Sequence, residues 1–285
     1  RAKAAIVIPP GFEEALQSGR EASIQLLVEG TEPNTANTAM GFVGGYTGRF
    51  ALEIVREVAG RSGIVFGEAV LNPVDLRVRT WYNPGLESRV DLVPGLLSIV
   101  LGMPALSVAL TIANEREHGT LEQLMATPIS RAELLLGKMI PYILVGMVNA
   151  ILIPIIAITW FDIPFNGSFA LFFFLTVLFM FAILSLGIVV GVFMPTQPAA
   201  LALSFLVIFF PGFFLTGIFF PIASMPEIMR LEALALPGTH YGIITRGTFL
   251  TGVGLDVLWP YGVMLFVLGC VFVAVAALFF RKKLG

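Results

Sequence analysis

Two long uncharged runs, separated by a short charged segment, constrain the fold more than any other feature of this sequence. Residues 92–113 and residues 139–161 contain no Asp, Glu, Lys, Arg or His. Each run exceeds the roughly 20 residues that an α-helix needs to cross a hydrocarbon layer about 30 Å thick. Three more such runs follow, at residues 169–193, 199–220 and 258–280. The sequence therefore predicts an α-helical polytopic membrane protein with five spans.

Charged side chains are concentrated near the N-terminus. Residues 1–91 hold 9 basic and 11 acidic side chains, whereas residues 163–226 hold none. We therefore expect a polar domain at residues 1–90 and a membrane domain at residues 91–285. The pattern of the polar part predicts a small α/β domain. Its expected strands are Ala4–Ile8, Ile24–Val28 and Val74–Trp81, and its expected helices are Phe12–Gln17 and Asn34–Val58.

Basic residues near the spans predict how the membrane domain is oriented. Arg116, Arg131 and Lys138 lie in the first loop and three more basic residues lie at 281–283, whereas the loop at 162–168 has neither Lys nor Arg. By the positive-inside rule, the first loop and the C-terminal tail are cytoplasmic and the N-terminal domain is outside. A polar outer domain with no signal peptide or apolar run before it leads us to expect that a preceding span is missing.

The charged segment at residues 114–137 has well-defined local signals. Gly119 is expected to interrupt the helix that leaves the membrane. Thr120-Leu-Glu-Gln123 has the pattern of a capping box that starts a new short helix, and Ser130-Arg-Ala-Glu133 has the pattern of one that opens the next span. The segment therefore predicts a short helix lying along the cytoplasmic surface of the membrane.

Residues 221–256 are too apolar for an ordinary loop and too interrupted for a span. Ser224-Met-Pro-Glu227 has the pattern of a third capping box, Pro237-Gly238 stops that helix, and Thr239–Leu250 forms a second leg. Irregular backbone at membrane depth is tolerated only where protein or a water-lined cavity covers it. We therefore expect a re-entrant hairpin on the outer side, acting as an external gate.

Several functional classes are disfavoured. Ion-coupled carriers need an ionisable group at depth, and the five runs contain none. Gly137-Lys138 lacks the first glycine and the following hydroxyl residue of a phosphate-binding loop, so we expect no ATP site in this chain. With one cysteine, and with His118 and His240 on opposite sides of the membrane, we expect neither a metal site nor a catalytic centre. A net charge of −2 without a basic stripe gives no reason to expect a nucleic-acid partner.

Polar side chains inside the runs leave two interpretations open. They line a path for a solute, or they form hydrogen bonds between helices that contribute about 0.6 kcal/mol each, which is the commoner use of such residues. These residues are Asn149, Thr159, Ser185, Ser204 and Thr216.

Short motifs extend from the charged segment through the rest of the chain. They are Asn114-Glu-Arg-Glu-His-Gly-Thr-Leu-Glu-Gln-Leu124, Thr127-Pro128, Gly137-Lys138, Asp162-Ile-Pro-Phe-Asn-Gly167, Thr196-Gln197, Pro211, Gly217 to Met225-Pro226, Pro237, Tyr241, Arg246-Gly247 and Gly252, with Ile8-Pro9-Pro10-Gly11-Phe12 and Trp81-Tyr82-Asn83-Pro84 upstream. Together these motifs resemble the permeases of the ATP-binding cassette type-2 (ABC-2 type) transporter family, in the bacterial drug-efflux-like branch that has a large extracytoplasmic domain. The resemblance covers essentially the whole chain.

The resemblance implies a fold with six spans, of which the first is absent here together with the start of the outer domain. Two permease subunits, identical or paralogous, would pair with a cytoplasmic ABC ATPase dimer in the inner membrane of a bacterial-type cell. ATP and Mg²⁺ would be bound by that partner, so this chain would bind no cofactor and would not be an enzyme.

The resemblance also implies which residues act. The short surface helix would be the coupling helix that docks on the ATPase, and the outer hairpin would be the gate. The implied coupling residues are Glu115, Arg116, Glu117, Gly119, Thr120, Glu122 and Leu124. The implied gate residues are Gly217, Pro221, Met225, Pro226, Pro237, Tyr241 and Arg246.

We therefore expect the permease subunit of an ATP-driven exporter that moves a drug-like or lipophilic solute outward by alternating access. Two alternatives come from other classes. One is a membrane scaffold or assembly factor that borrows an ATPase without moving a solute. The other is an ion-coupled secondary carrier, which the uncharged spans disfavour.

Overall fold

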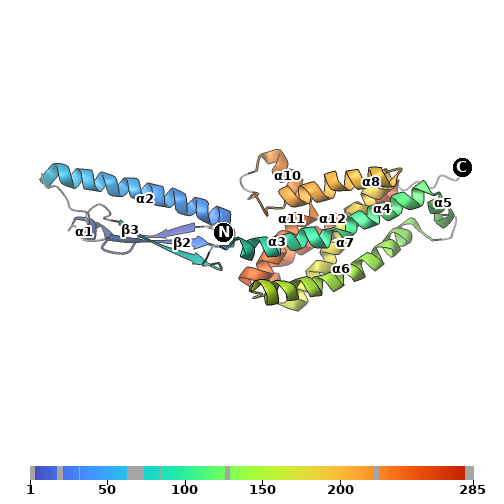
Figure 1. Ribbon diagram of the computed structural model, residues 1–285, viewed down its shortest axis with the longest axis horizontal. Helices are drawn as coiled ribbons and strands as arrows, with labels where there is room; N and C mark the ends of the chain where they lie inside the picture. The colour runs from blue at the N-terminus through green and yellow to red at the C-terminus, as the bar shows by residue number, and fades with distance from the viewer. Residues whose placement is uncertain are drawn as a thin grey trace. The chain divides into compact units, whose positions relative to one another are not determined.

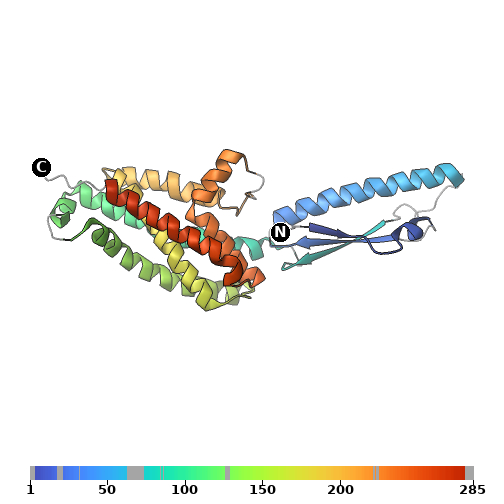
Figure 2. The same cartoon turned by 180° about the vertical axis from the view of Figure 1, so that it is seen from behind.

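The computed structural model describes residues 4–17, 22–31, 33–62, 74–83, 85, 87–125, 129–220, 222 and 225–279. By its internal packing the chain divides into two compact units, Arg1–Val90 and Asp91–Gly285. The first unit holds a sheet and the second is a helical bundle (Figures 1 and 2).

The first unit is a three-stranded sheet with one long helix lying along it (Figure 1). Its elements are β1 (Ala4–Val7), α1 (Phe12–Gln17), β2 (Ala22–Glu29), α2 (Pro33–Ser62) and β3 (Val74–Trp81). The central strand β2 is antiparallel to β1 and parallel to β3, and α2 provides the long crossover that a parallel pair requires. Alternate residues of β2 are buried, and Leu26 and Val28 pack with Ala36 of α2. The predicted small α/β fold is confirmed.

Apart from the first residues of α3, the helices from α3 to α12 belong to the second unit. They are α3 (Ser88–Gly102), α4 (Pro104–Glu117), α5 (Thr120–Met125), α6 (Arg131–Phe161), α7 (Phe169–Phe193), α8 (Gln197–Ser204), α9 (Phe210–Phe214), α10 (Glu227–Ala235), α11 (Pro237–Arg246) and α12 (Leu255–Phe279). Two π-helical segments, η2 (Phe205–Phe209) and η4 (Gly247–Thr251), follow α8 and α11.

Within the described residues, five helical stretches are long and apolar enough to cross a membrane, as predicted. They are Ser88–Glu117, Glu133–Phe161, Phe169–Phe193, Gln197–Phe214 and Leu255–Phe279.

Two of these stretches differ from the predicted runs. The first is broken between α3 and α4, because Pro104 has no backbone N–H with which to continue the helix. The fourth ends at Phe214 rather than at residue 220, since the chain turns at Gly217, which has a φ of +82°.

Helix α7 is the central helix of the bundle. It packs against α4, α6, α11 and α12, and Figure 2 shows α12 lying along it. The approach of α4 is close: a Cβ atom on Gly187 would lie 2.3 Å from the carbonyl oxygen of Ala105, and one on Gly191 would lie 2.8 Å from that of Ala109. Two glycines one turn apart therefore let the α4 backbone pack directly against α7, as small residues do in membrane helix pairs.

Of the three predicted capping boxes, one is confirmed, one differs from the structure and one lies partly outside the described residues. The Ser130 hydroxyl accepts a hydrogen bond from the Glu133 backbone N, and the Glu133 carboxylate accepts one from the Ser130 backbone N, so the box that opens α6 is confirmed. At α5 the structure differs, because Thr120 is already inside the helix and its hydroxyl donates to the Glu115 carbonyl. That carbonyl belongs to the last turn of α4, where helical partners are missing. Helix α10 begins at Glu227, and Ser224 lies outside the described residues.

Candidate functional site

The charged segment joins α4 to α6 through the short helix α5. Helix α4 ends at Glu117, and His118 and Gly119 form a turn in which Gly119 has a φ of +70°. Glycine adopts this left-handed conformation without the cost that a side chain would add. On α5, Gln123 is exposed and Leu124 is partly buried. The side chain of Glu122, a predicted coupling residue, lies outside the described part of the chain.

Glu115, on the last turn of α4, forms an ion pair with Lys138 near the start of α6. The Lys138 Nζ atom lies 2.5 Å from each carboxylate oxygen. The lysine and glutamate side chains are only 15% and 21% exposed. Partial burial reduces screening by solvent and salt but also costs desolvation of both charges, so losing one partner would leave the other charge poorly compensated. The pair holds the end of α4 against α6.

Arg116 and Glu117 connect the end of α4 to two further helices. Arg116 Nη1 donates to the carbonyl of Val192 at the end of α7, at 2.8 Å. The Glu117 carboxylate accepts from the backbone N of Gln197, the first residue of α8, at 3.0 Å. The Gln197 side chain in turn donates to Asn114 Oδ1. A carboxylate at a helix N-terminus satisfies a free N–H and is favoured by the helix dipole. Three consecutive side chains thus join α4 to α6, α7 and α8.

These contacts give the charged residues a role that sequence reasoning missed. That Glu115, Arg116 and Glu117 contact a partner stays a prediction, and each of them also makes a contact within the bundle. Sequence reasoning did not single out Lys138 and Gln197 as their partners, because pattern reasoning does not pair residues that lie 23 and 80 positions away. The available signal was one of charge: Lys138 is the nearest lysine after Glu115.

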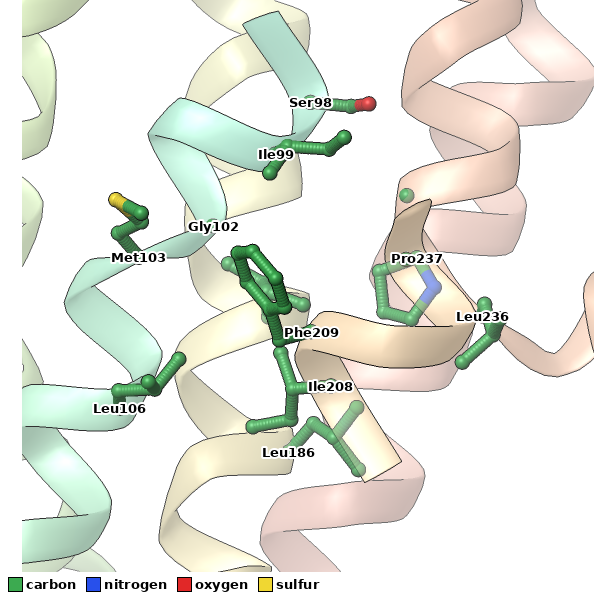
Figure 3. Close-up of a pocket in the computed structure, with 13 residues that line it drawn as sticks. Ser98, Ile99, Gly102, Met103, Leu106, Leu186, Ile208, Phe209, Leu236 and Pro237 are labelled. Carbon is green, nitrogen blue, oxygen red and sulfur yellow. The ribbon is translucent and has the colours of Figure 1, made fainter. Parts of the chain in front are cut away.

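A small apolar cavity lies in the bundle where three helical elements are interrupted (Figure 3). The interruptions are the α3–α4 break, the π-helical segment η2 and the α10–α11 junction. The cavity has a volume of about 30 Å³, room for about two water molecules. Its lining includes Ile99 of α3, Met103 at the break, Leu106 of α4, Leu186 of α7, and Ile208 and Phe209 of η2.

Polar groups contribute little to this cavity. Ser98 is the only described lining residue with a polar side chain, and its hydroxyl already donates to the carbonyl of Gly95. The polar residues that the sequence placed inside the spans mostly bond locally: Thr159, Ser185 and Thr216 each donate to the carbonyl four positions earlier in the chain. Within the described ranges, no three His, Cys, Asp or Glu side chains lie close enough together to hold a metal ion. The cavity therefore suits an uncharged, apolar group.

The two legs of the predicted outer hairpin differ in burial. Helix α10 is exposed except for Ala233, and Ile228 is 82% exposed. Helix α11 is buried along almost its whole length. The ring of Tyr241 stacks on Phe179 with centroids 4.1 Å apart, and its hydroxyl lies 2.8 Å from Thr176 Oγ1. Helix α11 is therefore part of the core of the bundle.

The remaining predicted gate residues lie at the ends of these legs: Gly217 in the turn after α9, Met225 and Pro226 before α10, Pro237 at the start of α11 and Arg246 at its end. Pro221 lies outside the described residues. Sequence reasoning missed Asp91, which pairs with Arg246. In the sequence, Asp91 had only marked the start of the predicted membrane domain at residues 91–285.

His240 belongs to α11 and lies outside the five membrane-length stretches. Its Nε2 atom lies 2.8 Å from the carbonyl oxygen of Leu234, to which it donates a hydrogen bond across the junction of the two legs. Burial lowers the pKa of the His240 ring, and this bond opposes the shift only in part. Burial therefore disfavours the protonated form of the ring.

Comparisons with known proteins extend over almost the whole chain. A family model described as "ABC-2 family transporter protein" matches residues 1–278. The chain is 30% identical over 249 residues to the "Probable multidrug ABC transporter permease YbhS" of Escherichia coli (strain K12), which covers 87% of this chain and 64% of YbhS. It is 28% identical over 276 residues to "Probable multidrug ABC transporter permease YbhR" (96% and 72%) and 29% identical over 285 residues to "Inner membrane transport permease YhhJ" (99% and 73%), both from the same strain. The chain thus spans less than two thirds of the length of YbhS.

Proposed function

Because this chain belongs to the ABC-2 family of transporter proteins, we propose that it is the membrane-spanning permease subunit of an ATP-driven exporter. It is a multi-pass protein of the inner membrane. In this proposal a separate cytoplasmic ATPase dimer binds ATP and Mg²⁺, and a second permease subunit, identical or paralogous, completes the transporter. The solute is drug-like or lipophilic and moves outward.

The way α5 is joined to the bundle carries this proposal. Helix α5 follows directly on Gly119, and behind it Glu115, Arg116 and Glu117 contact α6, α7 and α8. A partner that displaces α5 therefore acts on the end of α4 and, through it, on three other helices at once. In this mechanism ATP closes the ATPase dimer, α5 moves with it, and the charged contacts transmit the movement into the bundle. They link helices inside the permease, while α5 forms the docking surface.

The apolar cavity supports a lipophilic solute. A charged group placed against this lining would be buried without a partner, which costs several kcal/mol. The relatives YbhS and YbhR carry the word multidrug in their names. The cavity as described is too small for a drug-sized molecule, so export requires the three interrupted elements around it to separate. Alternating access provides that separation.

A charge-swap experiment tests the proposal. The permease is reconstituted with its cognate ATPase in inside-out vesicles, and ATP-dependent uptake is followed for a neutral, a cationic and an anionic dye (Nile red, ethidium and calcein). We expect uptake of the neutral dye. Glu115→Lys and Lys138→Glu should each lower that uptake by about tenfold, because each places like charges in a partly buried pair. The double swap should recover most of it, since the pair is restored with reversed polarity.

His118→Ala is the matched control for the swap. His118 is exposed on the same turn, and its ring bonds to the carbonyl of Asn114 four positions earlier, so uptake should not change. If the double swap fails to recover uptake although it folds and binds the ATPase, the transmission mechanism is wrong. If no dye moves although the permease stimulates ATP hydrolysis, a scaffold that borrows an ATPase replaces the exporter. Uptake driven by an ion gradient without ATP would favour a secondary carrier.

A further inference from the structure

A buried ion pair joins the end of α11 to the start of α3. Arg246 Nε lies 2.6 Å from Asp91 Oδ1, and the two residues are 155 positions apart in sequence. The arginine and aspartate side chains are only 10% and 8% exposed. Removing one partner of such a pair leaves the other charge buried and uncompensated, which is strongly destabilising. The pair therefore holds two distant segments of the bundle together.

The same guanidinium also holds the turn that precedes the outer hairpin. Arg246 Nη1 donates to the carbonyl of Gly217 at 3.1 Å. Gly217 has a φ of +82°, which favours glycine. Arg246 also packs closely against α3, since a Cβ atom on Gly95 would lie 3.6 Å from its Nη2 atom. One side chain thus contacts α3, the turn after α9 and, through its own backbone, α11.

Further contacts fix the remainder of the second leg. Tyr241 bonds Thr176 of α7, as described above. In η4, which continues α11, the carbonyl of Leu250 accepts from Asn166 Nδ2 at 2.8 Å and the carbonyl of Phe249 accepts from the Asn166 backbone N. Helix α10 is held by fewer described contacts: its side chains are exposed apart from Ala233, and the carbonyl of Leu234 accepts a hydrogen bond from His240 Nε2 at the junction with α11. The two legs are therefore held very differently.

We propose that Arg246 and Asp91 are positioning residues that fix α11 to α3, so that the opening of the outer hairpin is carried by α10 alone. The hairpin then hinges at the α10–α11 junction, beside the apolar cavity, instead of moving as one rigid gate. This inference deepens the proposed exporter function and rests on it for the moving leg. The anchoring of α11 is independent of ATP.

Thiol reactivity in nanodiscs tests this inference. The native Cys270 is the only cysteine and is exposed, so Cys270→Ala provides the background. Thr245→Cys reports on α11, because Thr245 is fully buried beside Arg246 and, among the described residues, its hydroxyl bonds to the carbonyl of Gly242 in its own helix. Ile228→Cys reports on α10. The measured quantity is the rate of modification by a membrane-impermeant methanethiosulfonate reagent.

Without nucleotide, Thr245→Cys should be protected when the ion pair is intact. Adding Asp91→Asn or Arg246→Gln should speed its modification by about tenfold or more, because a segment that loses its anchor opens locally. Arg246→Lys should retain part of the protection, since it keeps the charge opposite Asp91. Ser204→Cys on α8 is the matched control: Ser204 is fully buried, its hydroxyl has no partner among the described residues, and its reactivity should not change.

With the ATPase and ATP present, the intact pair should keep Thr245→Cys protected while the modification rate of Ile228→Cys changes. Modification of both positions during ATP turnover would show that the hairpin moves as a unit and would overturn the proposal. Continued protection of Thr245→Cys in Asp91→Asn would show that the pair is not the anchor. A simultaneous rise in the modification rate of Ser204→Cys would reveal general unfolding of the variant. The anchoring role would then be decided by the protection of Thr245→Cys in Arg246→Lys and in the protein with the intact pair. An absence of ATP response at Ile228→Cys, with the anchor results as expected, would count against the exporter function alone.

Discussion

Replacing Gly187 by alanine should destabilise the bundle, whereas the same replacement at Gly137 should stabilise it. A Cβ atom on Gly187 would lie 2.3 Å from the carbonyl oxygen of Ala105, about 1 Å closer than the 3.4 Å at which ordinary contact begins. Helix α4 must therefore move by about that distance or the helices must separate. A Cβ atom on Gly137, in α6, has nothing within 4 Å among the described residues.

The expected magnitudes follow from these distances. Overpacking costs about 1–3 kcal/mol, and a clash with backbone lies near the upper value because no side chain can move aside. The better helix propensity of alanine returns about 1 kcal/mol at either site. We therefore expect Gly187→Ala to lose about 2 kcal/mol and Gly137→Ala to gain about 1 kcal/mol. Thermal unfolding of the detergent-purified chain, monitored by size-exclusion chromatography, ranks the variants by stability.

A double variant separates the backbone clash from a side-chain effect. The contact at Gly187 is made by the carbonyl oxygen of Ala105, so trimming that residue in Gly187→Ala/Ala105→Gly should not restore stability. Rescue by Ala105→Gly would refute the backbone explanation. A Gly187→Ala protein as stable as Gly137→Ala would refute the close packing of α4 on α7 altogether.

Three further predictions concern single side chains. Tyr241→Phe should lower the unfolding temperature, because the hydroxyl of Thr176 loses its hydrogen-bond partner on the other helix. The expected loss is equivalent to about 0.6 kcal/mol, the average for a hydrogen bond between membrane helices. Ser130→Ala should cost about 1 kcal/mol and Ser130→Asp should not, since only the alanine removes the acceptor at the start of α6; the same melting assay compares them. Burial lowers the pKa of His240 in the folded state, so the unfolded state binds more protons below about pH 6.5. Stability should therefore fall as the pH drops through this value. Melts of His240→Gln from pH 5 to 8 should lack that fall.

The features that were predicted from the sequence are those with a local physical cause. A long run without charged side chains must be helical in a bilayer, whatever its neighbours, and α7 was predicted with the bounds that the structure has. The alternating residues of β3 and the capping box at Ser130 likewise depend on their own segments. The break at Pro104 also has a local signal, but it lies within a run whose hydropathy alone predicted one continuous span.

The features that were not predicted depend on which distant segments meet. Nothing in the pattern around Asp91 indicates that its partner is Arg246, and nothing around Glu117 indicates that it caps α8. Helix α5 starts at Thr120 as predicted, but its capping box was predicted incorrectly for a related reason. Thr120 has the right spacing for a cap, but unsatisfied carbonyls at the end of α4 offer its hydroxyl a competing partner. Pattern reasoning therefore identifies the charged segment and misses its contacts within the bundle.

The first membrane-length stretch, Ser88–Glu117, is held at both ends by ion pairs and interrupted between them. At one end, Asp91 is held by Arg246 of α11, and at the other, Glu115 is held by Lys138 of α6. Between these two anchors the helix is interrupted at Met103, which lines the apolar cavity. A helix that is fixed at both ends and broken in the middle responds to a force at one end by bending at the break, because the lost hydrogen bonds make that point the softest. In the proposed mechanism, a movement that starts at α5 is therefore converted into a change of shape beside the cavity, where the proposed solute path would open.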